Sequence, residues 1–201
     1  MTLAVAIYVF PDVEVLDFAG PYEVFTTASR VHRKKAFPGP EPFKVFTVAR
    51  EAGTIRARAG LVVVPDLTFA EHPAIDLLII PGGVVSSELE TPTVAEWIQR
   101  TSASAQLTAS VCTGAFLLAQ AGLLDGRSAT THWEDVEEMR EMFPAVAVLD
   151  ERAWVAEGRI VTSAGISAGM DMSLHLVERL ASRELALLTT RQLDYDWCEG
   201  G

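Results

Sequence analysis

The sequence is poor in basic residues and in cysteine. Its 201 residues include 16 Lys and Arg against 27 Asp and Glu, so the formal net charge is −11. A chain this acidic lacks the positive surface that binds nucleic acid, and an anionic membrane would repel it. Two cysteines, Cys112 and Cys198, are too few for a disulfide framework. We therefore expect a cytoplasmic protein without nucleic-acid or membrane partners.

Long apolar runs and several well-known motifs are also missing. No run approaches the roughly 20 apolar residues of a membrane-spanning helix. The first apolar run stops at Pro11 and Asp12 and lacks the basic start of a signal peptide. Neither C-x-x-C, H-E-x-x-H nor G-x-G-x-x-G occurs. Because these patterns mark common metal and dinucleotide sites, we expect no metal and no cofactor.

The residues that are present indicate one packed α/β domain over residues 1–201. Hydrophobic residues make up 49% and charged residues 21%, which is the balance of a globular protein. Short apolar runs alternate with helical patterns, and this predicts a flavodoxin-like sandwich: a mostly parallel sheet with helices on both faces. Strands are expected at 3–10, 43–50, 76–80, 107–111, 127–131, 146–149, 153–156 and 159–162, with a hairpin of 54–58 and 61–64. Helices are expected at 18–30, 91–104, 115–121, 133–142, 166–180 and 184–194.

Cys112 is the first candidate for chemistry, because it stands where the apolar strand 107–111 meets a helix. With Thr113 and Gly114 after it, the position resembles a nucleophile elbow with Cys in place of Ser. The N–H groups of the following helix are expected to lower the pKa of the thiol. The alternative is that Cys112 packs as a small hydrophobic residue. Cys198, in a polar tail, is expected to be an incidental exposed thiol.

Ligands of such sheets bind beyond the carboxyl ends of the strands, which directs attention to two more segments. Gly82 and Gly83 follow the strand 76–80, and they could aim N–H donors at a developing negative charge or end the strand in an ordinary turn. Asp17 follows the first strand. It could serve as an N-cap, or as a proton donor whose pKa is raised by burial and by a neighbouring thiolate.

His132 lies 20 residues after Cys112, at the end of a short predicted strand. A histidine close to a cysteine suggests a nucleophile and its base. A structural histidine at the start of the next helix is the alternative. Position alone does not decide between them.

Several of these segments together resemble the ThiJ/PfpI family of the class I glutamine amidotransferase-like superfamily. The resemblance covers residues 3–180. The motifs that carry it are VLDFAGP at 15–21, IPGG at 80–83, SVCTGA at 110–115, GLLDGR at 122–127, ATTHW at 129–133 and TSAGISAGMD at 162–171.

Within that family the chain is most similar to isonitrile hydratases and to the sensing domains of AraC-type regulators. Isonitrile hydratases pair an Asp before the first helix with the elbow Cys, and Asp17 and Cys112 match both. The resemblance therefore implies a Cys112 nucleophile, Asp17 as acid and base, and a Thr113 hydroxyl that orients water or nitrogen. The proteases of the family carry His directly after the nucleophile, and Thr113 stands there, so peptidase activity is not expected.

Two other functions are compatible with the same residues. The chain could be a sensing module for a small metabolite, without the DNA-binding region of the AraC-type regulators. It could also be a redox or stress protein that acts through oxidation of Cys112. Because family members commonly pair, we expect a homodimer with a small-molecule substrate.

Overall fold

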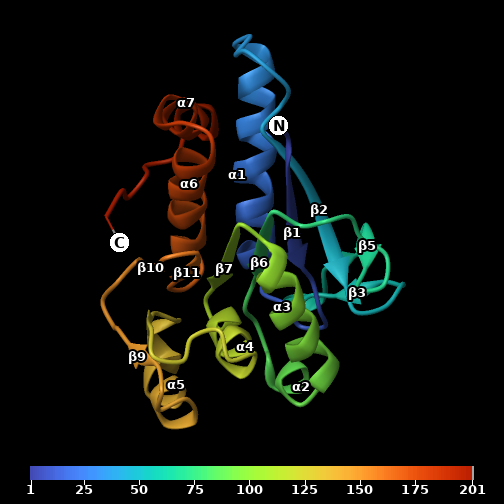
Figure 1. Cartoon of the computed structure of the whole chain (residues 1–201), viewed down its shortest axis with the longest axis vertical. Helices are drawn as coiled ribbons and strands as arrows, with labels where there is room; N and C mark the ends of the chain where they lie inside the picture. Colours follow the sequence, from blue (N-terminus) through green and yellow to red (C-terminus); the bar gives the residue numbers. More distant parts are fainter. Residues whose placement is uncertain (201) are drawn as a thin grey trace.

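Seven short strands form one central sheet in the computed structural model, which describes residues 1–200 (Figure 1). They are β1 (Leu3–Tyr8), β2 (Phe43–Ala49), β5 (Leu67–Thr68), β6 (Leu77–Ile80), β7 (Leu107–Val111), β10 (Trp154–Glu157) and β11 (Ile160–Ser163). Their order is β10-β11-β7-β6-β1-β2-β5. β10 is antiparallel to β11, and the other neighbouring pairs are parallel, which confirms the predicted mostly parallel sheet.

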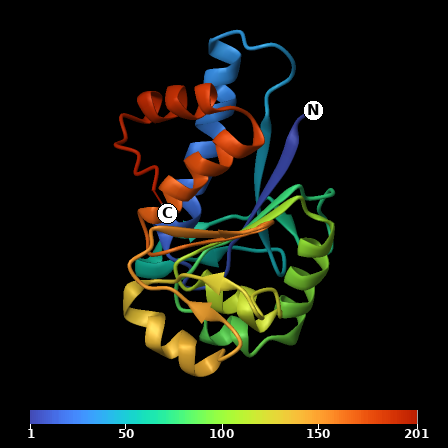
Figure 2. The same ribbon diagram turned by 60° about the vertical axis from the view of Figure 1, so that its left-hand side comes forward.

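Helices cover both faces of the sheet, as predicted (Figure 2). They are α1 (Val15–Lys34), α2 (Ser86–Leu89), α3 (Pro92–Ser104), α4 (Gly114–Gln120), α5 (Val136–Met142), α6 (Ala168–Leu180) and α7 (Arg183–Leu193). α1, α6 and α7 pack together on one face, while α3 and α4 lie on the other. Because both faces are covered, every residue of β6 and β7 is buried.

Short peripheral elements complete the chain. The predicted hairpin is present as β3 (Ile55–Arg56) and β4 (Val62–Val63), joined through the 3₁₀ turn η1 (Arg58–Gly60). β8 (Ser128–Ala129) and β9 (Ala147–Val148) pair outside the main sheet. A second 3₁₀ turn, η2 (Trp133–Asp135), leads into α5. Among the described residues, no helix combines the length and apolar character needed to cross a membrane.

The start of α1 differs from the prediction. The helix begins at Val15, and its N-cap is Glu14, whose side chain accepts a hydrogen bond from the Val15 N–H at 3.1 Å. Asp17 therefore lies inside the helix, and its expected alternative role as N-cap is wrong. Pro21 lies well inside the helix and not in its first turn. Since proline has no N–H, α1 lacks the hydrogen bond to the carbonyl oxygen of Asp17 at that point.

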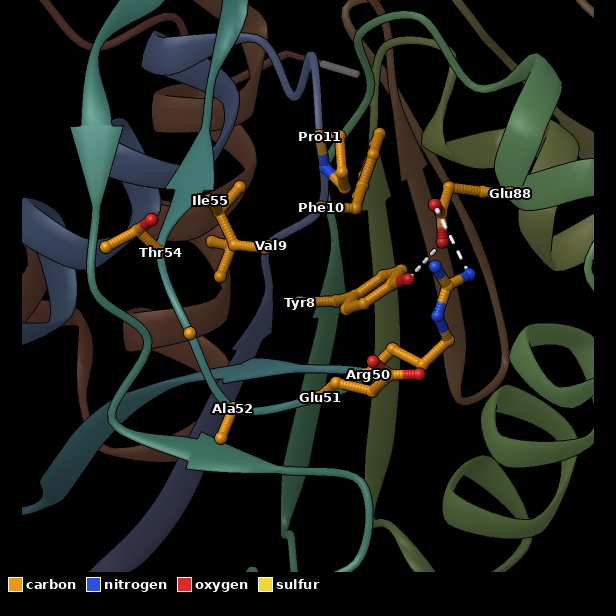
Figure 3. Close-up of a pocket in the computed structure, with 11 residues that line it drawn as sticks. Tyr8, Val9, Phe10, Pro11, Arg50, Glu51, Ala52, Thr54, Ile55 and Glu88 are labelled. Atoms are coloured by element: carbon orange, nitrogen blue, oxygen red, sulfur yellow. Dashed lines mark hydrogen bonds and ion pairs between the residues drawn. The ribbon is translucent and has the colours of Figure 1, made fainter.

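The buried carboxylate of Glu88 connects α2 to the sheet through polar contacts (Figure 3). Glu88 is 2% exposed, and its Oε2 accepts a hydrogen bond from the Tyr8 hydroxyl at the end of β1. Its Oε1 lies 3.9 Å from Arg50, which follows β2. Figure 3 shows the Glu88 carboxylate joined to both partners. The three residues help to line a cavity of about 180 Å³. Both oxygens of this buried group thus have a polar neighbour.

Candidate active site

The predicted elbow is present where β7 meets α4. Cys112 has φ of +56°, in the left-handed region that side chains other than glycine seldom adopt. A Cβ at Gly114 would overlap the carbonyl oxygen of Ile80, so only glycine lets α4 start this close to β6. The carbonyl oxygen of Cys112 accepts a hydrogen bond from Thr131 at 3.0 Å. The close packing of Gly114 on Ile80 and the hydrogen bond from Thr131 therefore keep Cys112 in this strained conformation.

The thiol of Cys112 does not have the lowered pKa that the sequence suggested. Burial raises its pKa to about 12, and the charges of Asp17 and Asp135 act in the same direction. The N–H of Thr113 hydrogen-bonds the sulfur and lowers the pKa, but this contribution is smaller. The expected lowering is wrong because burial and the nearby carboxylates outweigh the effect of the helix N-terminus. The thiol is neutral at rest.

Asp17 is fully buried and only half partnered. Its Oδ2 accepts a hydrogen bond from the N–H of Gly82 at 3.0 Å, whereas its Oδ1 has no partner among the described residues. Burial raises the pKa of this carboxyl from 3.8 to about 7, and the charge of Glu14 adds to the rise. The nearby Cys112 side chain interacts favourably with the carboxylate and acts the other way. The raised pKa was predicted, but burial is its main cause and no thiolate contributes.

The two glycines after β6 bind protein groups. The N–H of Gly82 is taken by Asp17, and the N–H of Gly83 donates to the Thr113 hydroxyl oxygen at 2.9 Å. The same hydroxyl donates to the carbonyl oxygen of Gly83 at 2.9 Å. In this arrangement neither glycine N–H is free to stabilise an oxyanion, and the Thr113 hydroxyl is not free to orient water. The sequence pattern could not show these hydrogen bonds, because they are tertiary contacts.

His132 lines the same pocket as Cys112, as its spacing suggested. It is also the N-cap of η2, where its Nδ1 accepts a hydrogen bond from the N–H of Glu134 at 3.3 Å. The ring packs over Gly165, where a Cβ would collide with it. The structural alternative for His132 is thus realised, and the histidine still borders the site.

The pocket beside Cys112 has a volume of about 200 Å³. Its lining includes residues that the sequence patterns did not single out, namely Glu14, Arg58, Val84, Glu134, Asp135 and Ile166. Arg58 comes from η1, so the hairpin brings a distant segment to the site. Short polar turns carry no periodic signal, which explains why these residues were not found. Cys198 is exposed, as expected.

The parallel sheet, the left-handed cysteine and the loop after β6 define an α/β protein with a cysteine nucleophile elbow. The DJ-1/PfpI family model matches residues 4–179. The chain belongs to this family, which confirms the resemblance found in the sequence.

The relatives of similar sequence include both an enzyme and a transcriptional regulator. An isonitrile hydratase of Pseudomonas putida is 33% identical over 196 residues, which cover 97% of this chain and 79% of that protein. The HTH-type transcriptional regulator GbdR of Pseudomonas aeruginosa is 34% identical over 158 residues, or 79% of this chain. The match spans 43% of that regulator's length.

Solved structures share the fold. A ThiJ/PfpI family protein from Pseudomonas syringae has a TM-score of 0.84 and 28% identity, over 98% of this chain and 76% of that one. DJ-1beta of Drosophila melanogaster has a TM-score of 0.81 over 98% of this chain and 100% of that one, and its 20% identity shows the fold alone.

Proposed function

We propose that the protein is a cofactor-independent hydratase that converts isonitriles to N-substituted formamides. The observation that carries this proposal is the pairing of Cys112 with Asp17. A buried thiol whose pKa is near 12 touches a buried carboxyl whose pKa is near 7 and whose second oxygen lacks a partner. The 33% identity to an isonitrile hydratase across nearly the whole chain supports the same reaction.

The first step joins the Cys112 sulfur to the terminal carbon of R–N≡C. A neutral thiol is a weak nucleophile, so ionised Asp17 accepts its proton as the sulfur attacks. The lone pair of the carbon then takes this proton from Asp17, and one C–N π pair moves to nitrogen. The product is the thioimidate R–N=CH–S–Cys112. Because the proton only passes through Asp17, the step needs no outside acid.

The second step adds water to the thioimidate carbon. Asp17 takes a proton from the water and passes it to nitrogen, which gives R–NH–CH(OH)–S–Cys112. The C–S bond then breaks, the hydroxyl proton returns to sulfur through Asp17, and R–NH–CHO leaves. The N–H of Thr113 stabilises charge on the sulfur in both steps. We assign this role to the backbone of Thr113, while Gly83 and His132 line the pocket and Gly82 holds Asp17.

The test is detection of both the covalent intermediate and the product. The protein is incubated with a panel of alkyl isonitriles and quenched in acid, and its peptides are mapped by mass spectrometry. We expect an adduct of the isonitrile mass on the peptide that contains Cys112, with formamide in the solution. Cys198→Ser serves as the control and should retain both signals. Formamide without dependence on Cys112 would contradict the mechanism.

A sensing module is the second candidate, favoured by the 34% identity to a transcriptional regulator. Such a module would show saturable binding of a small metabolite without turnover. Redox sensing has less support, because oxidation follows thiolate character and burial keeps the pKa of Cys112 high.

We also propose that the protein is a cytoplasmic homodimer, as the family resemblance implies. Light scattering should then give twice the 21.8 kDa of one chain. A mass of one chain at micromolar concentration would contradict this.

A further inference from the structure

Four charged side chains line the Cys112 pocket, and three of them are acidic. They are Glu14, Arg58, Glu134 and Asp135. The Arg58 guanidinium lies 3.3 Å from the Glu14 carboxylate, so these two charges largely offset each other. The two other acidic side chains, Glu134 and Asp135, both belong to η2, and together they form the acidic wall of the pocket.

His132 cannot neutralise both remaining carboxylates. Its Nδ1 lies 3.3 Å from the Oδ2 of Asp135 and 3.7 Å from the Oε2 of Glu134. A neutral imidazole leaves two excess negative charges on this wall, and an imidazolium leaves one. The wall is therefore negative in either protonation state. Its field reaches the reacting atom, because the charge of Asp135 contributes to the raised pKa of Cys112.

Apolar groups stand beside the acidic wall. Trp133 is 77% exposed, and its ring centroid lies 5.6 Å from that of His132. Val84, also on the pocket, is 47% exposed. An exposed indole next to carboxylates attracts organic cations through both its ring face and their charge. The fully buried Asp17, which contacts Cys112 and keeps one oxygen without a partner, belongs to the reacting end of the site and not to this wall.

We infer that this site selects small electrophiles whose remote end carries an ammonium or another cationic group, and that it excludes carboxylates. The inference rests on the proposed function for the reacting end, the isonitrile. For the remote end it rests on the charges of η2 and on Trp133. A cleft lined by charge of one sign concentrates ligands of the opposite sign and raises their association rate by about 10-fold or more.

The charge preference can be measured without any turnover. Methanethiosulfonate reagents transfer a thioalkyl group to a cysteine thiolate and release methanesulfinate, and they exist with ammonium and with sulfonate ends. Cys198→Ser protein leaves Cys112 as the one thiol of the sequence. Each rate is divided by the rate of the same reagent with free 2-mercaptoethanol. We expect the ammonium reagent to react about 10-fold faster than the sulfonate after this correction, with a smaller ratio in high salt.

Charge variants assign the effect to the wall. Glu134→Gln with Asp135→Asn should bring the corrected ratio close to one. Glu134→Gln alone, on a side chain that is 63% exposed, should lower the ratio part of the way if the double variant does not fold. Glu141→Gln removes the same charge from α5 outside the pocket and should leave the ratio unchanged. Equal corrected rates for the two reagents would overturn the inference. So would a rate ratio that stays unchanged when Glu134 is replaced.

Isonitriles of matched size then separate this inference from the proposed reaction. Their remote ends are trimethylammonium, tert-butyl and carboxylate, and kcat/KM is expected to fall in that order. A labelling preference without any isonitrile turnover would leave the charge selection in place and reject the hydratase. Turnover with no order among the three would retain the hydratase and reject the charge selection.

Discussion

Glu88 and Asp17 are both buried carboxyl groups near the carboxyl ends of the strands, yet their surroundings differ. Each oxygen of Glu88 has a neighbour, the Tyr8 hydroxyl or the Arg50 guanidinium. Asp17 has a single N–H partner, one empty oxygen and a pKa raised to about 7. Both oxygens of Glu88 thus have a polar neighbour, whereas Asp17, which interacts with Cys112, keeps one oxygen without a hydrogen-bond partner.

This difference separates a structural carboxylate from a functional one. A buried charge with good partners contributes to a single packed arrangement, and its removal leaves those partners unsatisfied. A buried carboxyl with one oxygen left unpartnered destabilises the fold when it ionises, and such groups concentrate at functional sites. The neutral thiol of Cys112 is the group in contact with Asp17, and the two together hold the proton that the proposed reaction moves.

The largest expected effect comes from the nucleophile itself. Cys112→Ser should lower isonitrile turnover by about a thousandfold or more, because removing a covalent nucleophile costs most of the catalysis. Serine is close in size, so the free energy of unfolding should change by less than about 1 kcal/mol. Steady-state formamide assays and urea unfolding measure the two quantities. Turnover near the parent rate in this variant would end the nucleophile proposal, and Cys198→Ser should be kinetically silent.

Asp17→Asn should produce the next largest effect on turnover. Asparagine keeps an oxygen that can accept from the N–H of Gly82, but it cannot carry the thiol proton. Turnover should fall by about 100-fold or more, the usual scale for general acid–base catalysis. A variant that folds normally and works at the parent rate would leave Asp17 a structural residue and direct the search for the acid to His132.

The same substitution should stabilise the fold at high pH. The pKa of Asp17 in the folded protein, about 7, lies above its ordinary value of 3.8. The folded state therefore binds more protons in this window, and its stability falls as the pH rises through it. Above pH 7 the ionised carboxyl costs roughly 2 kcal/mol or more, which Asp17→Asn removes. Because the penalty accumulates as the pH rises from 3.8 to about 7, urea unfolding should show a clearly larger gain at pH 8 than at pH 5.

Glu88→Gln should have the opposite sign and a smaller size. The substitution weakens the charge-assisted hydrogen bond from Tyr8 and leaves Arg50 without its carboxylate. We expect a loss of about 1.5 kcal/mol in the free energy of unfolding at pH 8. Formamide assays on the folded variant should give near-parent turnover, since Glu88 does not line the Cys112 pocket. If Glu88→Gln instead raised the free energy of unfolding, as Asp17→Asn is expected to do, the contrast between a structural Glu88 and a functional Asp17 would be wrong.

Much of the sheet and the elbow could be predicted from the sequence. The apolar runs at 76–80 and 107–111 are β6 and β7 within one residue, because strands covered on both faces leave a continuous apolar signal. Cys112 at the strand–helix junction already indicated the elbow. α2 and β5 were missed because segments of four and two residues carry no period.

The electrostatics of the site could not be predicted in the same way. The pKa of Cys112 depends on burial and on Asp17 and Asp135, which reach it from other parts of the chain. Glu88 gave no signal, because a single glutamate in a polar stretch is expected to be solvated. The hydrogen bonds that occupy Gly82 and Gly83 are also tertiary, so the sequence could suggest donors near the site but not whether they were free.

The pH profile of kcat/KM tests the central claim most directly, namely that Asp17 and Cys112 share one catalytic proton. The productive pair carries a single proton, and a second one binds as the pH falls below the Asp17 pKa of about 7. The parent protein should gain activity about tenfold per pH unit below 7 and level off above it. Asp17→Asn should show its small residual activity without this inflection. A flat parent profile, or the same inflection in Asp17→Asn, would contradict the account.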